Sequence, residues 1–411
     1  MTNMTINTTA TTVASTPTTN SIGKSGVHLE QASAQWANRP VDERFWDLAE
    51  MDTATTKWAS ECREAKRDLK AMRVEAKDGE VVLVGPQGNP ALFSHYAFGQ
   101  FSARMSAPAG YLRTLPAELA ARNLEHSLQV RATSGQETEQ ANILIHLNGG
   151  MRVQAFTSDR YERIWNGQIV KWARSLPEGW RVAPARPTGQ DGERVRIATE
   201  ADCLQNRLEG LGIQPGNRIA PAGLYASDHD CFIFMVNESL TVRTPDGRSL
   251  NRGFFLKNSE VGDSALVLTM FLYDAVCGNH IVWNAEGVRE LRIRHIGDPA
   301  KFARTKVLPM VNQLSQLSAT ADEDRLRAAF RLVLGKTRDE VVKTLYAKDL
   351  APRTTLEAAF NVATEHQHTH GDPRTAWGMA SGITRLSQAT GYSDRREELD
   401  RVGGKILELA W

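Results

Sequence analysis

The sequence FFLKNSEVGDSALVLTMFLYDAVCGNHIVW, residues 254–283, is the most apolar part of the chain and decides the fold that we expect. Its segment 267–272 carries no charge and lies between Gly262 and Gly278. Such a run, rich in β-branched and aromatic residues, predicts a central strand covered on both faces. Short polar residues surround the run, and they either line a site or form turns. They are Asn258, Ser259, Glu260, Cys277, Asn279 and His280.

Alternating apolar segments elsewhere predict the strands that pair with this run. They are residues 80–84, 91–93, 141–147, 151–156, 231–236 and 252–257. Asn148-Gly149 between two of these segments is a strong hairpin signal, so we expect mostly antiparallel pairing. We therefore predict an α+β fold, with a central, mostly antiparallel sheet flanked by helices and an all-helical C-terminal region.

The same patterns divide the chain into four parts. We expect a disordered Thr-rich tail over 1–28, an N-terminal helical segment over 29–78, an α+β core domain over 79–297 and a helical C-terminal region over 298–411. The helical segment rests on apolar spacing that predicts a pair of helices within 42–76. Capping signals predict the C-terminal helices; they begin at Thr320, Thr337, Thr354, Asp372 and Asp394.

Composition is that of an ordinary globular protein, because 41% of its 411 residues are hydrophobic and 24% are charged. A formal net charge of +1 gives no global attraction to nucleic acid or to an anionic membrane, so such binding requires a local patch. Four scattered cysteines without a CxxC pair argue against a zinc site and a disulfide framework. No apolar run approaches the length of a membrane span, and we expect a cytoplasmic protein.

The phosphate-binding loop, the dinucleotide fingerprint and the common hydrolase motifs are absent from the sequence. Histidine clusters offer two weaker metal candidates. Residues 365–372 hold three alternate histidines and two acids, which would converge on a metal ion if the segment were extended. The alternative is that these imidazoles complement the dipole at a helix C-terminus. Asp228-His229-Asp230 is an acid/base or metal element, or an ordinary polar strand edge. Cys277 and His280 would form a thiolate–imidazole pair only through a turn between them. We expect no bound metal and no cofactor.

Two concentrations of basic residues favour binding of single-stranded nucleic acid. The first interleaves arginines with aromatic residues; it comprises Arg152, Arg160, Tyr161, Arg163, Trp165, Lys171, Trp172 and Arg174. The second comprises Arg289, Arg292, Arg294, His295, Lys301, Arg304 and Lys306. Bases stack on aromatic rings and phosphates pair with guanidinium groups, so this combination suits a single strand. The alternative is a solvated face whose arginine stems cover apolar surface.

Several motifs also resemble the phage- and plasmid-borne proteins grouped as domain of unknown function 932. The resemblance covers about residues 80–411 and rests on TSDRYERIWN (157–166), KNSEVG (257–262) and CGNH (277–280), with support from 93–98, 111–116, 375–378 and 394–396. The motif residues are Ser158, Asp159, Asn166, Asn258, Ser259, Glu260, Gly262, Cys277 and Asn279. The resemblance implies a role beside replication, recombination or defence evasion on a mobile element. Gly278 and His280 depart from the pattern of this family.

From these observations we expect a non-enzymatic, nucleic-acid-associated protein of a phage or plasmid that binds or anneals single-stranded DNA, acts as a homo-oligomer and resides in the host cytoplasm. The expected contacts are Arg152, Arg160, Tyr161, Arg163 and Trp165, supported by Arg292, Arg294 and Lys301. Two alternatives stay open. One is a metal-assisted hydrolase or nuclease that uses Asp159, Asp228, His229, Asp230 or Glu260, and the other is an interaction protein that inhibits a host protein.

Overall fold

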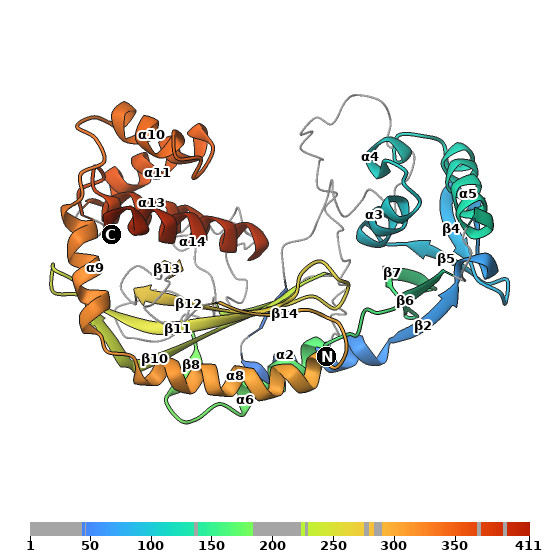
Figure 1. Cartoon of the computed structure of the whole chain (residues 1–411), viewed down its shortest axis with the longest axis horizontal. Coiled ribbons are helices and arrows are strands. Elements are labelled where there is room, and N and C mark those ends of the chain that lie inside the picture. The colour runs from blue at the N-terminus through green and yellow to red at the C-terminus, as the bar shows by residue number, and fades with distance from the viewer. Residues whose placement is uncertain are drawn as a thin grey trace, which may run out of the picture.

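The structure is a computed structural model of the whole chain. It describes residues 43–45, 47–134, 139–183, 223–226, 229–274, 279–282, 290–367, 371–388 and 393–411. In these ranges the chain forms two mostly antiparallel sheets with helices packed against them, and the C-terminal region is helical (Figure 1). The α+β class predicted from the sequence is confirmed, although the strands build two sheets rather than one. The Thr-rich tail over 1–28 lies outside the described residues.

The larger sheet contains the strand that the opening stretch of sequence predicts. In spatial order its strands are β1 (Glu43–Arg44), β9 (Leu224–Ala226), β10 (Cys231–Arg243), β11 (Ser249–Asn258), β12 (Leu266–Asp274) and β13 (Asn279–Val282); β8 (Trp180–Val182) pairs with β10, and β14 (Leu291–Ile293) pairs with β12. Every residue of β12 is buried, so the expectation of a strand covered on both faces is confirmed. A turn with Gly247 at a φ of +86° joins β10 to β11.

Helices cover both faces of the larger sheet. Figure 1 shows α2 (Leu48–Ser60), α6 (Asn166–Arg174) and α8 (Pro299–Gln316) along one face, and α13 (Ala376–Gln388) and α14 (Ser393–Leu407) over the other. On the first face, Ile233, Phe254 and Leu268 belong to the main hydrophobic core. On the second face, Lys257 of β11 forms an ion pair of 2.9 Å with Glu397 of α14.

The remaining C-terminal helices extend beyond this layer (Figure 1). They are α9 (Thr320–Arg331), α10 (Arg338–Tyr346) and α11 (Arg353–Glu365), and a 3₁₀ turn over Glu408–Ala410 ends the chain. Thr337 caps α10 as predicted, because its side chain accepts a hydrogen bond from the Glu340 N–H. α9 begins at Thr320 as predicted, and α11 and α14 begin one residue before Thr354 and Asp394. The predicted caps of α9 and α11 were wrong, because Ala319 and Pro352 hold the N-cap positions. Asp372-Pro373 leads into a turn ahead of α13.

The smaller sheet forms a second core. In spatial order its strands are β2 (Cys62–Asp68), β6 (Gln140–His146), β7 (Arg152–Ser158), β5 (Pro90–Phe93), β4 (Glu80–Val84) and β3 (Arg73–Lys77), with β5 and β7 parallel. α3 (His95–Arg104), α4 (Ala109–Leu112) and α5 (Ala117–Ser134) lie beside it (Figure 1). Phe101 of α3 contacts Phe156 of β7 edge-on at 4.9 Å between ring centroids.

The helical segment predicted for 29–78 was partly wrong. α2 is the first expected helix, but residues 62–68 form strand β2, and a 3₁₀ turn over Leu69–Ala71 leads into β3. β2 is an edge strand that pairs only with β6 among the described strands, so its many charged residues can reach solvent. Pairing with β6 overrides the helical spacing of the apolar residues. The expected domain boundary after residue 78 therefore cuts through the smaller sheet.

The two sheets meet at the segment that connects β7 to α6. Leu144 and Ala155 of the smaller sheet pack against Val261, which follows β11 of the larger sheet. Cys62, Tyr96 and Trp165 pack around this contact. Most of the residues that the sequence singled out lie at or near this junction.

Candidate nucleic-acid interface

A short β-bridge brings the two basic stretches of the sequence together. Tyr161, in the segment after β7, pairs with Ile296, in the segment after β14, in antiparallel orientation. The Glu162 N–H donates to the His295 carbonyl oxygen at 2.9 Å, which continues the same pairing. Antiparallel register then places Arg160 opposite Gly297, two residues before α8. Residues 160 and 292–306 are thus parts of one region.

Six cations are exposed in this region, and we call them the basic surface. They are Arg160, Arg292, Arg294, Lys301, Arg304 and Lys306. Within the described residues none of the six has an ion-pair partner. Exposed Asp159 and Asp298 lie in the same segments and offset part of the charge. The surface retains a positive balance that the net charge of the chain does not reveal.

Local structure explains why these side chains face solvent. Ile293 is buried against the core, so its neighbours Arg292 and Arg294 point to the opposite side of the strand. In α8, Ala303 and Val307 belong to the buried stripe of the helix. The cations of α8 occupy positions outside this stripe.

Two apolar side chains lie within the same segments. Phe302 of α8 is 48% exposed and Ile296 is 59% exposed. The ammonium nitrogen of Lys306 lies 5.6 Å from the centroid of the Phe302 ring. An exposed ring beside cations is the combination that a base and its phosphate require. The sequence reasoning did not single out Phe302, because an aromatic residue in a helix is usually buried.

Arg163 is buried and therefore leaves the set of candidate phosphate contacts. Its side chain is 1% exposed and forms an ion pair with Glu64 of β2. Its Nε donates to the Glu260 carbonyl oxygen at 2.5 Å. The guanidinium carbon lies 5.4 Å from the ring centroid of Tyr161 and 5.6 Å from that of Trp165. Arg163 joins the two sheets rather than facing a ligand.

Tyr161 and Trp165 belong to the same junction. The Tyr161 hydroxyl donates to the Ser259 carbonyl oxygen at 2.8 Å, and its ring stacks on His295 at 4.9 Å between centroids. Burial raises the pKa of the Tyr161 hydroxyl above its ordinary value, and it lowers the pKa of His295 to about 4, so the imidazole is neutral near pH 7. Trp165 is half-buried. These rings make protein contacts and differ from an open base-stacking platform.

Arg152 lies away from the basic surface. It begins β7, whereas the bridge at Tyr161 follows the end of that strand. At about 3.3 Å per residue, β7 separates the two positions by roughly 20 Å. Arg152 is half-buried and paired in register with His146. Arg289, from the second basic stretch, lies outside the described residues.

The motif residues around Asn258 hold the junction together. Nδ2 of buried Asn258 donates to the Ile164 carbonyl oxygen at 2.9 Å and to Oδ1 of Asn166 at 2.8 Å. The Asn166 N–H donates to Oε1 of Glu260 at 2.5 Å. Burial raises the pKa of the Glu260 carboxyl to about 7. These groups therefore fix the start of α6 against the end of β11.

The other motif residues have different positions. Gly262 adopts a φ of +86°, which side chains disfavour. Ser158 and Asp159 are exposed at the end of β7, and Asn279 begins β13, paired with Asp274. Cys277 lies outside the described residues, and so does the turn through which it would pair with His280.

Of the two histidine-containing candidates, the one near residue 229 gains one further carboxylate, while its predicted member Asp228 lies outside the described residues. His229, Asp230 and Asp263 place one ligand atom each within 4.8 Å of one another. Asp263 was not expected there from the sequence; the Ser259 hydroxyl, which contacts both the His229 carbonyl oxygen and the Asp263 N–H, holds it close. In the other cluster, the Asp372 carboxylate accepts hydrogen bonds from Arg374, which lower the pKa of this carboxyl. Residues 368–370 lie outside the described ranges.

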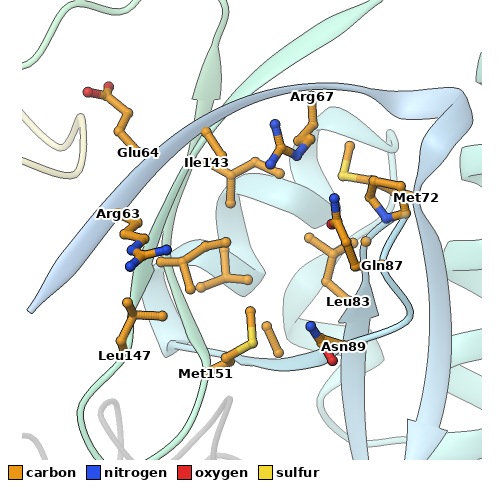
Figure 2. Close-up of a pocket in the computed structure, with 16 residues that line it drawn as sticks. Arg63, Glu64, Arg67, Met72, Leu83, Gln87, Asn89, Ile143, Leu147 and Met151 are labelled. Atoms are coloured by element: carbon orange, nitrogen blue, oxygen red, sulfur yellow. The ribbon is translucent and has the colours of Figure 1, made fainter.

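A pocket of about 450 Å³ opens on the smaller sheet (Figure 2). None of the six cations of the basic surface lines it. Its floor is apolar and includes Leu83, Ile143 and Met151. Arg63 and Arg67 of β2 border it on one side, and Gln87 and Asn89 on another (Figure 2). Arg67 donates to the carbonyl oxygen of its neighbour, Lys66, at 3.1 Å. The sequence reasoning missed this pocket, because residues 62–68 were expected to be helical.

The chain matches no protein-family model, and neither the curated proteins nor the solved structures include one with significant similarity to it. Within the described ranges, no helix is long and apolar enough to cross a lipid bilayer.

Proposed function

We propose that the protein binds single-stranded nucleic acid through the basic surface. The observation that supports this proposal is the Tyr161–Ile296 bridge, since it joins Arg160 to the cations of residues 292–306. Cations that lack acidic partners keep their charge available for phosphates. Exposed Phe302 adds a stacking surface beside them.

A single strand fits this surface better than a duplex. Sequence-tolerant binding of single strands combines a cationic track with aromatic side chains on which bases stack. In a duplex the bases are already stacked on each other, so Phe302 would gain little from it. The resemblance to domain of unknown function 932, the phage or plasmid origin, the homo-oligomer and the host cytoplasm remain predictions that accompany this proposal.

The test is fluorescence anisotropy with a labelled single-stranded oligonucleotide of about 30 nucleotides and a duplex of the same sequence. At about 50 mM salt we expect saturable binding of the single strand and weaker binding of the duplex. Equal affinity for the single strand and the duplex would exclude base stacking on Phe302. Lack of binding to the single strand would contradict the proposal.

A further inference from the structure

The end of one strand and the start of its neighbour converge near the junction of the two sheets. In the β10–β11 hairpin, Cys231 pairs with Asn258, so the residues just before β10 lie beside those just after β11. The Ser259 hydroxyl donates to the His229 carbonyl oxygen at 2.5 Å and accepts from the Asp263 N–H at 3.0 Å. A single hydroxyl thus fixes the backbone on both sides of the cluster.

The side chains of His229, Asp230 and Asp263 meet at ligand distances. Nε2 of His229 lies 3.8 Å from Oδ2 of Asp230, and one ligand atom from each of the three residues lies within 4.8 Å of the others. Bonds of about 2.1 Å to a tetrahedral ion put neighbouring ligand atoms roughly 3.4 Å apart. Small rotations of the side chains would close the set around one ion.

The surroundings orient these groups and leave a path for an ion. Asp230 is 1% exposed, whereas Asp263 is exposed to solvent. The Tyr96 ring, from α3 of the smaller sheet, stacks on the His229 ring at 5.9 Å with 10° between the planes. The Tyr96 hydroxyl hydrogen bonds to the Asp263 carboxylate. Groups that hold ligands in this way are typical of the outer shell of metal sites.

We propose that His229, Asp230 and Asp263 bind one divalent transition metal ion, of the Mn²⁺ or Zn²⁺ class. An imidazole together with two carboxylates suits these ions, whereas Mg²⁺ prefers oxygen ligands alone. The ion would neutralise two carboxylates, one of them buried. Three protein ligands leave at least one coordination position for water or for an oxygen of a bound anion. This site does not depend on the basic surface.

The test is a titration of the full-length protein, stripped of metal with a chelator, with Mn²⁺. The electron paramagnetic resonance signal reports free Mn²⁺, and Zn²⁺ is added in competition. We expect one Mn²⁺ per chain, displaced by Zn²⁺ and not by an equal concentration of Mg²⁺. Asp263→Asn and His229→Gln should each weaken Mn²⁺ binding at least tenfold, since outer-shell changes alone weaken metal sites by about 10–100-fold.

The matched control is Asp339→Asn, which removes an exposed carboxylate on α10. We expect it to bind Mn²⁺ as the unmodified chain does. Circular dichroism of the metal-free variants checks their folding. If His229→Gln does not fold, the result is taken from Asp263→Asn, because Asp263 is exposed. Absence of saturable Mn²⁺ binding, or equal affinity in Asp263→Asn and Asp339→Asn, would overturn the site.

Discussion

Tyr161 and Ile296 form an isolated antiparallel β-bridge between segments that are distant in the sequence. The bridge lies where the two sheets meet, and buried contacts of Arg163, Asn258 and Glu260 surround it. Its outer side carries the basic surface. The junction therefore has a structural interior and a cationic exterior, and substitutions on the two sides should have different effects.

Phe302→Ala should weaken binding of single strands by about 1–3 kcal/mol, because one base loses its stacking partner. The 48% exposure of Phe302 means that stability should change little. Tyr346→Ala is the matched control, since Tyr346 is 57% exposed and lies on α10, away from β14 in Figure 1. Anisotropy titrations of both variants measure the difference, and equal affinities would exclude stacking on Phe302.

Arg163→Met should lower the free energy of unfolding by about 1–3 kcal/mol, because it removes hydrogen bonds of a charged group to Glu64 and Glu260. Its folded fraction should bind single strands as the unmodified chain does. Arg160→Met should show the reverse, with a change in stability within about 0.5 kcal/mol and weaker binding. Urea unfolding and anisotropy together distinguish the two roles. Weaker binding of single strands by folded Arg163→Met would show that Arg163 contributes to the nucleic-acid interface.

Gly262→Ala should destabilise the fold more than Gly247→Ala does. Both glycines have a φ of +86°, so each substitution should cost about 1–2 kcal/mol in backbone strain. At Gly262 an added Cβ would lie 3.0 Å from Cγ2 of Thr157, whereas nothing lies within 4 Å at Gly247. The difference between the two, measured by urea unfolding, isolates the close approach of β7 to the segment after β11. Equal losses of stability in the two variants would show that the structure around Gly262 adjusts to the added methyl group at no extra cost.

Asp400→Asn should flatten the dependence of stability on pH. Burial raises the pKa of the Asp400 carboxyl to about 7, and its Oδ1 accepts a hydrogen bond of 2.5 Å from Ser387. The folded chain therefore binds a proton more tightly than the unfolded chain, whose carboxyl titrates near pH 4. Stability from this group is fully present below about pH 4 and is lost as pH rises through about 7. The neutral amide should remove this loss.

The control for this measurement is Asp246→Asn. Burial acts to raise the pKa of Asp246, but hydrogen bonds from Arg248 and Thr244 outweigh it and lower the pKa. Its contribution is therefore present above the ordinary carboxyl pKa and is lost as pH falls. Urea unfolding between pH 4 and 8 should therefore show a flatter dependence of stability on pH in Asp400→Asn, whereas Asp246→Asn should keep the slope of the unmodified chain, because Asp246 titrates below this range. A flatter slope in both variants, or in neither, would contradict the assignment.

The elements predicted correctly are those whose signals lie within a few neighbouring residues of the sequence. Ser94 caps α3, Asn148-Gly149 joins β6 to β7, and the apolar run of 267–272 lies within β12. The strand β2 was not predictable in this way, because its pairing with β6 decides its conformation and the two strands are distant in the sequence. Glu64 of β2 and Asn142 of β6, which share a hydrogen bond, lie 78 positions apart.

The candidate site was predicted in part. The exposed cations at Arg160, Arg292, Arg294 and Lys301 were all among the expected contacts. Burial of Arg163 could not be read from the sequence, because its partner Glu64 lies 99 positions away. Asp263 was missed for a related reason: the pairing of β10 with β11 and the hydrogen bonds of Ser259 bring it beside His229, 34 positions away in the sequence.

The most direct test of the basic surface is the salt dependence of single-strand binding. If all six cations contact phosphates, a plot of the logarithm of the binding constant against the logarithm of salt concentration should have a slope of about −4, at roughly −0.7 per contact. Arg292→Gln with Arg294→Gln should make the slope less steep by about 1.4. Lys343→Gln with Lys348→Gln, which removes two exposed cations in and just after α10, should leave it unchanged. Equal slopes for the two double variants would contradict the proposed interface.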